Sequence, residues 1–399
     1  MKAATPRRLH RYLCRRLKLR RYLDAPGDGR CQPQIPAHLL LWAQLIGIIL
    51  RKPSFHAIES LGRSPARSAL VLSRSFGDDA LAYFTERLAV DPLQQALGSV
   101  LEQAKRNKAF EASRLIGFAL DGTGTGRCRT GACPLCHPVV NEKQQVVGYL
   151  HHLSLISLVG AGLSLPFDVE PYGPGDSEQA ASQRLLRRAV HRLGRRFADY
   201  VVADGLYATA PFLHLARELG LSVVVRLKAN LPQLLSQAQT RFESIAPTRT
   251  FGLGRDQVEV WDADDFDPWD SLDWITVRVI RYWQHKPDGT VFEAYWLTNF
   301  PSAKISSQTL FVSAKSRWEI ENQGFNDAKN RYGFEHIDHH HPNSLRIQWL
   351  LTCLALTVER LYRLRYLHRG THVCHTPAQF HLLLWISLGR PQPAPSDTS

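Results

Sequence analysis

The chain has 399 residues, of which 44% are hydrophobic and 21% charged, and this globular composition excludes a largely disordered protein. Its 49 lysine and arginine residues against 36 acidic ones give a net charge of +13, which favours a polyanionic partner, either nucleic acid or an acidic membrane surface. The longest apolar run, residues 39–50, is too short to cross a bilayer, and the first 20 residues lack the apolar segment of a secretory signal. Seven cysteines in a chain of this length do not form a disulfide framework, so we expect a cytoplasmic protein without a membrane partner.

The N-terminal third is predicted to be helical and basic. Residues 1–21 carry nine lysines and arginines and no acid, and leucines recur every four residues from Leu9 to Leu17, which predicts a basic amphipathic helix. We interpret residues 1–35 as a basic arm that neutralises DNA phosphates, with a solvated tail as the alternative. Residues 36–110 show helical patterns with short breaks; they are interpreted as a DNA-binding region, although a purely structural helical cap fits equally well.

Strands begin in the next part of the chain. Apolar residues alternate from Leu115, which predicts a strand. We expect this strand to end at Gly122, which leaves Asp121 at its carboxyl end. Two further strand-like runs occupy residues 146–160 and 163–173.

A βαβ-like pattern follows these strands. An arginine-rich helix over residues 177–196, which we expect to contact DNA phosphates, leads to a short buried strand that ends in Asp204. A helix over residues 211–219 and a strand over residues 221–228 complete the unit.

The remaining chain contains an insertion, a long helix and a tail. Residues 231–312 are rich in tryptophan and aspartate, and the Lys-Pro-Asp-Gly sequence at 286–289 lies between two strand patterns, which predicts a β-rich insertion with a hairpin. A helix is predicted over residues 317–333, and an apolar helix follows at 345–362. Residues 366–399 are interpreted as a C-terminal tail with a disordered, proline-rich end.

Three carboxylates carry the predicted chemistry. Asp121 and Asp204 end two strands of one sheet, and Glu321 lies on a helix that can pack across it. Three carboxylates at one sheet edge can hold two divalent cations, and oxygen ligands suit Mg²⁺ or Mn²⁺. Such a pair activates a water or a 3′-hydroxyl and stabilises the leaving oxygen of a phosphodiester.

The helix over residues 317–333 separates two glutamates. Arg317 and Glu321 lie about 40° apart around an α-helix, on one face. Glu319 and Glu321 lie about 200° apart, so Glu319 is expected to face away and to contribute no more than a surface ion pair, worth about 0–1 kcal/mol.

Several segments resemble the DDE transposases of bacterial insertion sequences. The likeness rests on ALDGT around Asp121, VVADGLYA around Asp204, VVRLK at 224–228 and RWEIENQGFNDAK at 317–329, within residues 36–365. The resemblance implies cut-and-paste DNA transfer by Mg²⁺-dependent phosphodiester hydrolysis and transesterification. It also implies double-stranded DNA partners (element ends and target), a homodimer on DNA, and a bacterial, nucleoid-associated location.

The resemblance also implies a fold and a set of catalytic residues. The expected fold is α/β, with a ribonuclease-H-like mixed sheet flanked by helices, a β-rich insertion and an N-terminal helical region. The catalytic domain would comprise residues 111–230 and 313–365. Two Mg²⁺ ions (or Mn²⁺) would be held by three ligands: Asp121, Asp204 and Glu321.

The helix signature of this family reads Tyr, two residues, Arg, three residues, Glu, six residues, Lys. Arg317 and Glu321 keep their spacing, whereas the tyrosine position holds Ala314 and the lysine falls one residue late, at Lys329. On a regular α-helix Lys329 would then point about 80° away from Glu321. The candidate phosphate contacts are Arg317, Lys329 and, as a substitute at a strand end, Lys228.

Two further clusters involve cysteine and histidine. A structural Zn²⁺ site is one interpretation of three cysteines, completed by His137, His151 or His152; reduced thiols in a loop are the alternative. The cysteines are Cys128, Cys133 and Cys136. The HIDHHH sequence at 336–341 is interpreted as a polar loop, because three adjacent histidines cannot all reach one metal.

Two other functions remain open from the sequence. One is a two-metal DNA nuclease of the same fold that cuts without strand transfer. The other is a non-catalytic, transposase-derived DNA-binding protein, which the presence of all three carboxylates disfavours.

Overall fold

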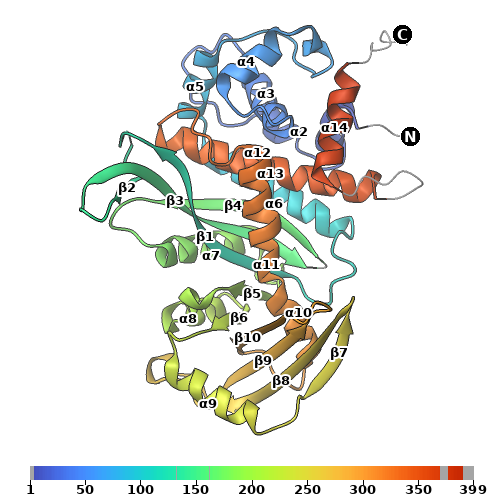
Figure 1. Ribbon diagram of the computed structural model, residues 1–399. Coiled ribbons are helices and arrows are strands. Elements are labelled where there is room, and N and C mark those ends of the chain that lie inside the picture. Colours follow the sequence, from blue (N-terminus) through green and yellow to red (C-terminus); the bar gives the residue numbers. More distant parts are fainter. Residues whose placement is uncertain (1–3, 132, 161, 369–375, 390–399) are drawn as a thin grey trace.

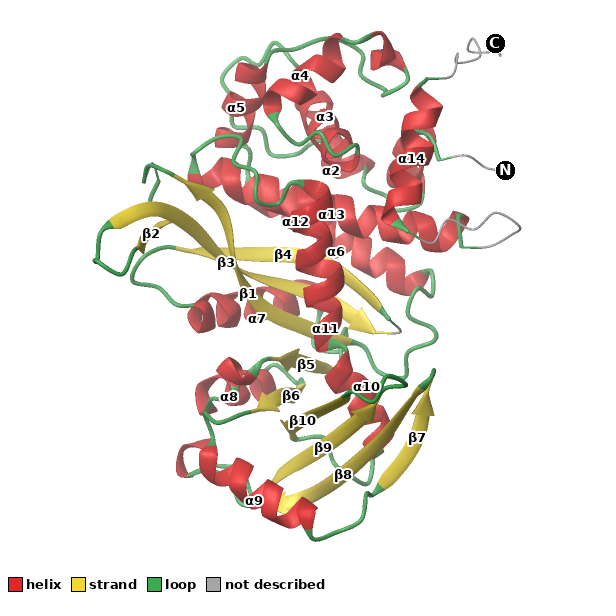
Figure 2. Ribbon diagram, in the orientation of Figure 1, coloured by secondary structure: helices red, strands yellow, loops and turns green. Residues whose placement is uncertain are grey.

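The computed structural model describes residues 4–131, 133–160, 162–368 and 376–389. Within them, ten strands form one sheet in the order β2-β3-β1-β5-β6-β10-β9-β8-β7, with β4 also paired to β3 (Figure 1). Most helices gather at the end of the molecule above β3 and β4, and the β7–β10 strands lie at the opposite end (Figure 2). None of the helices in the described ranges combines the length and apolar character needed to cross a bilayer.

The first six strands form one end of the sheet. They are β1 (Gly117–Cys128), β2 (Cys136–Val140), β3 (Val146–Gly160), β4 (Leu163–Tyr172), β5 (Tyr200–Ala203) and β6 (Ser222–Leu227). The β1, β3 and β4 strands are antiparallel, and β5 and β6 run parallel to β1. Three antiparallel strands followed by two parallel ones, in the order β4-β3-β1-β5-β6, constitute the ribonuclease-H-like arrangement, so the predicted fold class is confirmed.

The segment predicted as a β-rich insertion extends this same sheet. It contains α9 (Pro232–Glu243), β7 (Arg249–Leu253), β8 (Asp256–Phe266), β9 (Val277–His285) and β10 (Val291–Thr298). Because β10 pairs with β6 in antiparallel fashion, the insertion strands continue the central ladder. The predicted hairpin at 286–289 joins β9 to β10.

The N-terminal region is helical, as predicted. Its helices are α1 (Pro6–Arg15), α2 (Arg20–Asp24), α3 (Ala37–Ile49), α4 (Phe55–Arg63), η1 (Pro65–Ser68), α5 (Asp78–Arg87) and α6 (Val90–Arg106). The apolar α3 is buried along almost its whole length, because the long helix α13 (Pro342–Tyr366) and α4, α5 and α2 surround it. The indole of Trp42 on α3 donates to the Leu70 carbonyl at 2.8 Å, which satisfies its buried N–H.

The basic N-terminal segment packs against this helical body. Leu9 and Leu13 are fully buried on α1, and Tyr12 meets two α13 tyrosines edge-on at 5.3 and 5.6 Å between ring centroids. Thr5 caps the helix by accepting from the Arg8 backbone N–H. The solvated-tail alternative is therefore wrong for α1, whose leucine stripe is part of the core.

The arginine-rich helix α7 (Glu178–Leu193) packs against β4. Three arginines at four-residue spacing form ion pairs within the fold: Arg184, Arg188 and Arg192. Their acceptors include Asp168 and Glu170 on β4. These three side chains neutralise carboxylates of the fold. The other arginines of the predicted segment, Arg187, Arg195 and Arg196, are exposed, and DNA contact by this helix stays a prediction.

The remaining helices are short, apart from those of the site. They are η2 (Gly205–Tyr207), α8 (Ala210–Glu218), η3 (Asp270–Leu272), α10 (Ser307–Lys315) and α14 (Pro377–Leu388). Within the predicted tail, α14 lies beside the N-terminal helices, where His381 is hydrogen-bonded to the Leu50 carbonyl at 2.9 Å. The proline-rich end, 390–399, lies outside the described residues.

Candidate active site

Asp121 and Asp204 lie at the same level on two neighbouring parallel strands. The β1 and β5 strands pair with Ala119 opposite Val202, and each aspartate follows two residues later. The prediction that Asp121 ends its strand is wrong, because β1 continues to Cys128 alongside the long strand β3. The parallel pairing with β5 stops at Ala119, so both aspartates lie just beyond the paired residues.

Arg317 joins the first aspartate to the helix that carries Glu321. Its Nη1 lies 3.6 Å from Oδ2 of Asp121, and its Nη2 lies 3.2 Å from Oε2 of Glu321. The Arg317 side chain is 13% exposed, whereas the Glu321 side chain is 55% exposed. One guanidinium thus holds Asp121 and Glu321 on the same side of the sheet.

Asp204 has a cationic partner of its own. Nζ of Lys228, which follows β6, lies 2.8 Å from Oδ1 of Asp204. Asp204 is the N-cap residue before η2, where the Gly205 backbone N–H hydrogen-bonds to its carboxylate. The predicted substitute phosphate contact therefore lies directly at the carboxylates.

The two aspartates differ in acidity. Burial, with the carboxylates of Glu178 and Asp204, raises the pKa of Asp121 to about 6 against the opposing charge of Arg317. Burial also acts to raise the pKa of Asp204, but hydrogen bonds from Lys228 and the backbone, with nearby positive charge, hold it below the usual value. Perturbed and opposed titration of neighbouring carboxylates is typical of functional sites.

Glu178 is a fourth carboxylate that sequence reasoning missed. It lies in the first turn of α7 and accepts a hydrogen bond of 2.8 Å from the Tyr207 hydroxyl. A Cβ at Gly122 would overlap the Glu178 carboxyl, so the residue after Asp121 has to be glycine for this approach. That glycine, beside a predicted site aspartate, was the signal available in the sequence.

The helix after α10 changes its winding at the site. It begins as α11 (Arg317–Glu319), widens to a π-helical turn over Ile320–Phe325, and continues as α12 (Asn326–Tyr332). A π turn accommodates one extra residue relative to an α-helix and is frequent at functional sites. The predicted separation of about 80° between Glu321 and Lys329 is therefore wrong, because the wide turn absorbs one residue and reduces it to about 20°.

Lys329 faces β1 as a result of this winding. Its Nζ donates to the Gly124 carbonyl at 2.8 Å, three residues beyond Asp121, and lies 3.2 Å from the Glu335 carboxylate. All three sequence-predicted cations, Arg317, Lys228 and Lys329, thus lie around the aspartate strands.

A buried arginine of α13 braces the π turn. Arg360 is 3% exposed and donates to the backbone carbonyl of Gln323 within the turn. It also donates to the Ser164 carbonyl and pairs with Asp327 at 3.0 Å. These bonds satisfy backbone acceptors next to the irregular turn, where regular helical bonding is interrupted.

Glu319 lies on the opposite side from Glu321, but it is not a surface residue. The backbone N–H groups of Gly160 and Gly162 in the β3–β4 turn hydrogen-bond to its carboxylate, and its Oε2 is buried without a partner among the described residues. Burial raises the pKa of Glu319 to about 7. The expected surface ion pair is therefore wrong: the carboxyl lines a cavity of about 560 Å³ between β3 and α10.

The cysteine and histidine residues are arranged differently from the prediction. Cys133 and Cys136 meet His151 and His340, whereas Cys128 lies outside this group and is hydrogen-bonded to the Tyr149 carbonyl. His137 is hydrogen-bonded to the Tyr172 carbonyl instead. The HIDHHH loop is thus not uniformly polar surface, because His340 turns inward.

One comparison with known proteins covers the segment that contains the three carboxylates. The pattern of the family described as "Transposase DDE domain" matches residues 113–358, which is more than half of the chain and includes Asp121, Asp204 and Glu321. Among solved structures, the chain is similar to piggyBac transposase in a cryo-EM structure of its synaptic complex with hairpin DNA. The sequence identity is 11%, the TM-score is 0.47, and the match covers 97% of this chain and 80% of that chain. The comparison with curated proteins finds no match. On the extent of the family match, the chain belongs to the transposase DDE domain family.

Proposed function

We propose that the chain is a DNA transposase that cleaves element ends and transfers them into a target duplex. The observation that carries this proposal is the convergence of Asp121, Asp204 and Glu321 around Arg317, inside a segment matched to a transposase domain. In this proposal the three carboxylates are the catalytic residues.

The donor set fits a pair of divalent cations. The three side chains offer only carboxylate oxygens, which suit Mg²⁺ or Mn²⁺ and not soft metals. Arg317 and Lys228 already contact these carboxylates, which shows that the position attracts positive charge. When bound there, the two ions would supply the activated water or 3′-hydroxyl and stabilise the leaving oxygen of the phosphodiester.

The chain's own cations would position the DNA. Lys228 is 52% exposed and lies against Asp204, so its ammonium is within reach of a phosphate brought to the carboxylates. Arg317 presents a fork of donors that matches phosphate geometry. Lys329 follows Glu321 on the same helix and contacts β1 at Gly124. All three cations would therefore bind phosphates that flank the cleaved bond.

The wider proposal concerns partners and domains. The net charge of +13 supports double-stranded DNA, both element ends and target, as the partner. We propose a homodimer on DNA, a bacterial insertion sequence as the source and the nucleoid as the location. The catalytic domain would comprise residues 111–230 and 313–365, with DNA binding by the helical region at 36–110.

A strand-transfer assay tests the proposal. DNA flanking the reading frame would be searched for inverted repeats, and labelled ends would be incubated with the purified chain, Mg²⁺ and a supercoiled target. We expect end cleavage and joined products with the wild type. Glu321→Gln should abolish both while leaving DNA binding nearly intact, because the amide keeps the shape and loses the charge that holds a cation.

Glu319→Gln is the matched control, since it makes the same substitution two residues away on the opposite face of the helix. It should retain cleavage. Cleavage without joined products would favour the two-metal nuclease. Binding without cleavage by the wild type would favour the non-catalytic DNA-binding protein. An active Glu321→Gln variant with an inactive Glu319→Gln variant would overturn the assignment of the catalytic glutamate.

A further inference from the structure

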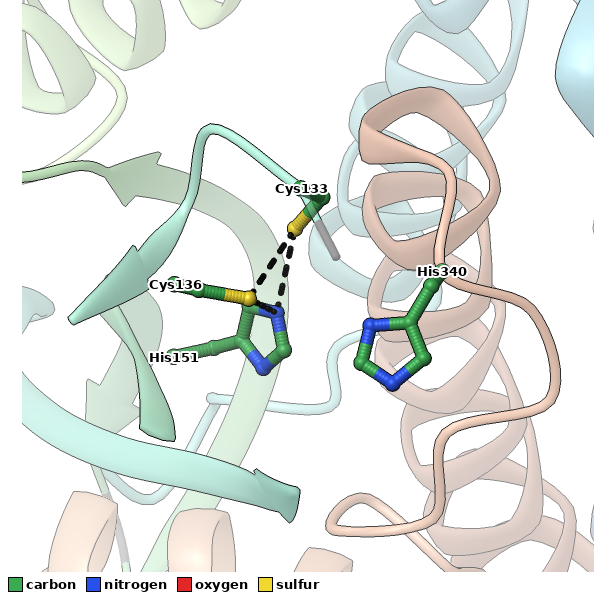
Figure 3. A group of neighbouring side chains, drawn as sticks. All are labelled: Cys133, Cys136, His151 and His340. Carbon is green, nitrogen blue, oxygen red and sulfur yellow. Dashed lines mark hydrogen bonds between the residues drawn. The ribbon is translucent and has the colours of Figure 1, made fainter. Parts of the chain in front are cut away.

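Four side chains that commonly bind metals meet beside the β1–β2 connection. Cys133 precedes β2, Cys136 begins it, His151 lies on β3, and His340 lies in the loop between α12 and α13. One ligand atom from each lies within 4.8 Å of the others, and Figure 3 shows both sulfurs next to the His151 ring, with the His340 ring facing them from the α12–α13 loop. The cluster joins segments that are far apart in the sequence.

The distances match those around a tetrahedral zinc ion. The two sulfurs are 3.5 Å apart, and Nε2 of His151 lies 3.3 Å from Sγ of Cys133 and 3.4 Å from Sγ of Cys136. With Zn–S bonds of about 2.3 Å and Zn–N bonds of about 2.0–2.1 Å, neighbouring ligand atoms are about 3.4–3.8 Å apart. Three ligand atoms thus already have nearly the spacing of one tetrahedral face.

The His151 ring is held in the orientation that a metal ligand needs. It is fully buried, and its Nδ1 lies 3.0 Å from the Gly126 carbonyl. A carbonyl can only accept, so Nδ1 carries the proton and Nε2 presents its lone pair to the sulfurs. A backbone carbonyl behind a histidine ligand is the usual support of zinc-binding histidines.

His340 supplies the fourth position. Its Nδ1 is buried and has no hydrogen-bond partner among the described residues. Its ring centroid lies 5.8 Å from that of His151, and in Figure 3 a ring nitrogen of His340 faces the sulfurs. A metal would satisfy this nitrogen, which no described protein group does.

We propose that Cys133, Cys136, His151 and His340 form a structural zinc site. Two thiolates and two imidazoles are a donor set that favours Zn²⁺ over Mg²⁺ or Ca²⁺, and four protein ligands close the coordination sphere. The Cys128 thiol contacts that of Cys136 but lies outside the group of four, so we do not assign it as a ligand. The proposal concerns a second metal, distinct from the ions proposed at the carboxylates.

The site fastens the end of the catalytic helix to the strand that carries Asp121. Lys329 bonds to the Gly124 carbonyl, the Thr125 hydroxyl donates to the Phe334 carbonyl at 2.9 Å, and Gly126 lies against Ile337. The zinc site would add one more link between β1 and the segment that follows α12.

The zinc site lies away from the carboxylates. His151 is paired with Thr125 across β1 and β3, four residues beyond Asp121, which is about 13 Å along the strand. Zinc therefore would not take part in phosphodiester chemistry, but would hold the segment that positions Lys329.

Metal analysis of the full chain tests the proposal, in buffer without DNA and Mg²⁺. We expect one zinc per chain by mass spectrometry of the purified protein. After zinc removal, one equivalent of Co²⁺ should give the visible absorption of tetrahedral cobalt with thiolate ligands. Cys133→Ser and His340→Gln should each lower Zn²⁺ affinity at least roughly tenfold in competition with a chromogenic chelator. Cys128→Ser is the matched control and should keep wild-type affinity.

A wild-type chain that retains no zinc and gives no tetrahedral Co²⁺ spectrum would overturn the proposal, and this measurement needs no variant to fold. Wild-type affinity in His340→Gln would overturn the link to the α12–α13 loop. Hydrogen exchange adds a second readout: zinc removal from the wild type should speed exchange at residues 334–341, and unchanged exchange would contradict the fastening role. Each result is independent of whether the chain transfers DNA.

Discussion

Replacement of Glu319 by glutamine should stabilise the protein at high pH and leave it unchanged at low pH. The carboxyl packs on the β3–β4 turn, and burial raises its pKa from 4.5 to about 7. Below pH 4.5 the carboxyl is protonated in both the folded and the unfolded chain. Between pH 4.5 and about 7 the unfolded chain releases this proton while the folded chain retains it, so stability falls as pH rises.

The size of the effect follows from the same pKa values. At about 1.4 kcal/mol for each pH unit, the rise to about 7 corresponds to a loss of about 3 kcal/mol once the pH exceeds the folded-state pKa. Glutamine has no proton to release, and its amide oxygen can accept from the same Gly160 and Gly162 N–H groups. The free energy of unfolding of the variant should therefore equal that of the wild type at pH 4.5 and exceed it by roughly 1–3 kcal/mol at pH 8.5.

Urea unfolding followed by tryptophan fluorescence, repeated from pH 4.5 to 8.5, measures this difference. Subtracting the variant curve from the wild-type curve isolates Glu319, since Asp121 titrates in both proteins. Glu321→Gln is the control: it makes the same substitution at a side chain that is 55% exposed, so it should not give this gain in stability at pH 8.5. A Glu319→Gln variant that is less stable than the wild type at pH 8.5 would refute the reasoning.

Three further changes test the supports of the site. Arg360→Met should lower the free energy of unfolding by about 3–5 kcal/mol in urea, because the Gln323 and Ser164 carbonyls lose their donor and Asp327 loses its buried partner, retaining the more exposed Arg331. Lys329→Met should weaken binding to element-end DNA and reduce the slope of log K against log salt by about one, because one phosphate contact is lost. Leu13→Ala should cost about 2–5 kcal/mol in urea unfolding, because its side chain is fully buried on α1.

The two stability predictions have matched controls. Arg365→Met removes an exposed arginine from the same helix as Arg360, and Arg11→Ala removes an exposed one from α1; neither should change stability by more than about 0.5 kcal/mol. An equal effect of Arg360→Met and Arg365→Met would rule out the bracing role. An unchanged salt slope for Lys329→Met would place that lysine outside the DNA interface. A Leu13→Ala variant as stable as the wild type would contradict the packing of α1 against the core.

Periodicity and strand-end residues predicted the sheet well. Alternation and short β-branched runs indicate five strands, β1, β3, β4, β5 and β6, and their order follows from the parallel β5 and β6 beside an antiparallel meander. Asp121 and Asp204 could be predicted together because parallel neighbours place equivalent residues side by side. The continuation of the sheet by the insertion could not, because the pairing of β10 with β6 depends on residues some 70 positions apart.

The errors have a common physical origin in contacts that sequence spacing does not encode. The angle expected for Lys329 assumes an α-helix throughout, whereas the wide turn is supported by a hydrogen bond that Arg360, on another helix, donates to the Gln323 carbonyl. His340 was grouped with its sequence neighbours, although its surroundings come from β2 and β3. Glu319 was assigned to solvent because its own helix does not show the glycine turn that covers it.

Side-chain cations affect the order in which metal and DNA bind. Lys228 pairs with Asp204, and Arg317 pairs with Asp121 and Glu321. Under the proposed function, two side-chain cations occupy the carboxylates before any metal arrives, and a divalent ion has to compete with them. DNA phosphates would draw the ammonium and the guanidinium away, so the affinities for Mg²⁺ and for DNA should rise together by the same factor. Without DNA, the protein would then bind Mg²⁺ weakly. The metal site would fill only when a DNA end is bound.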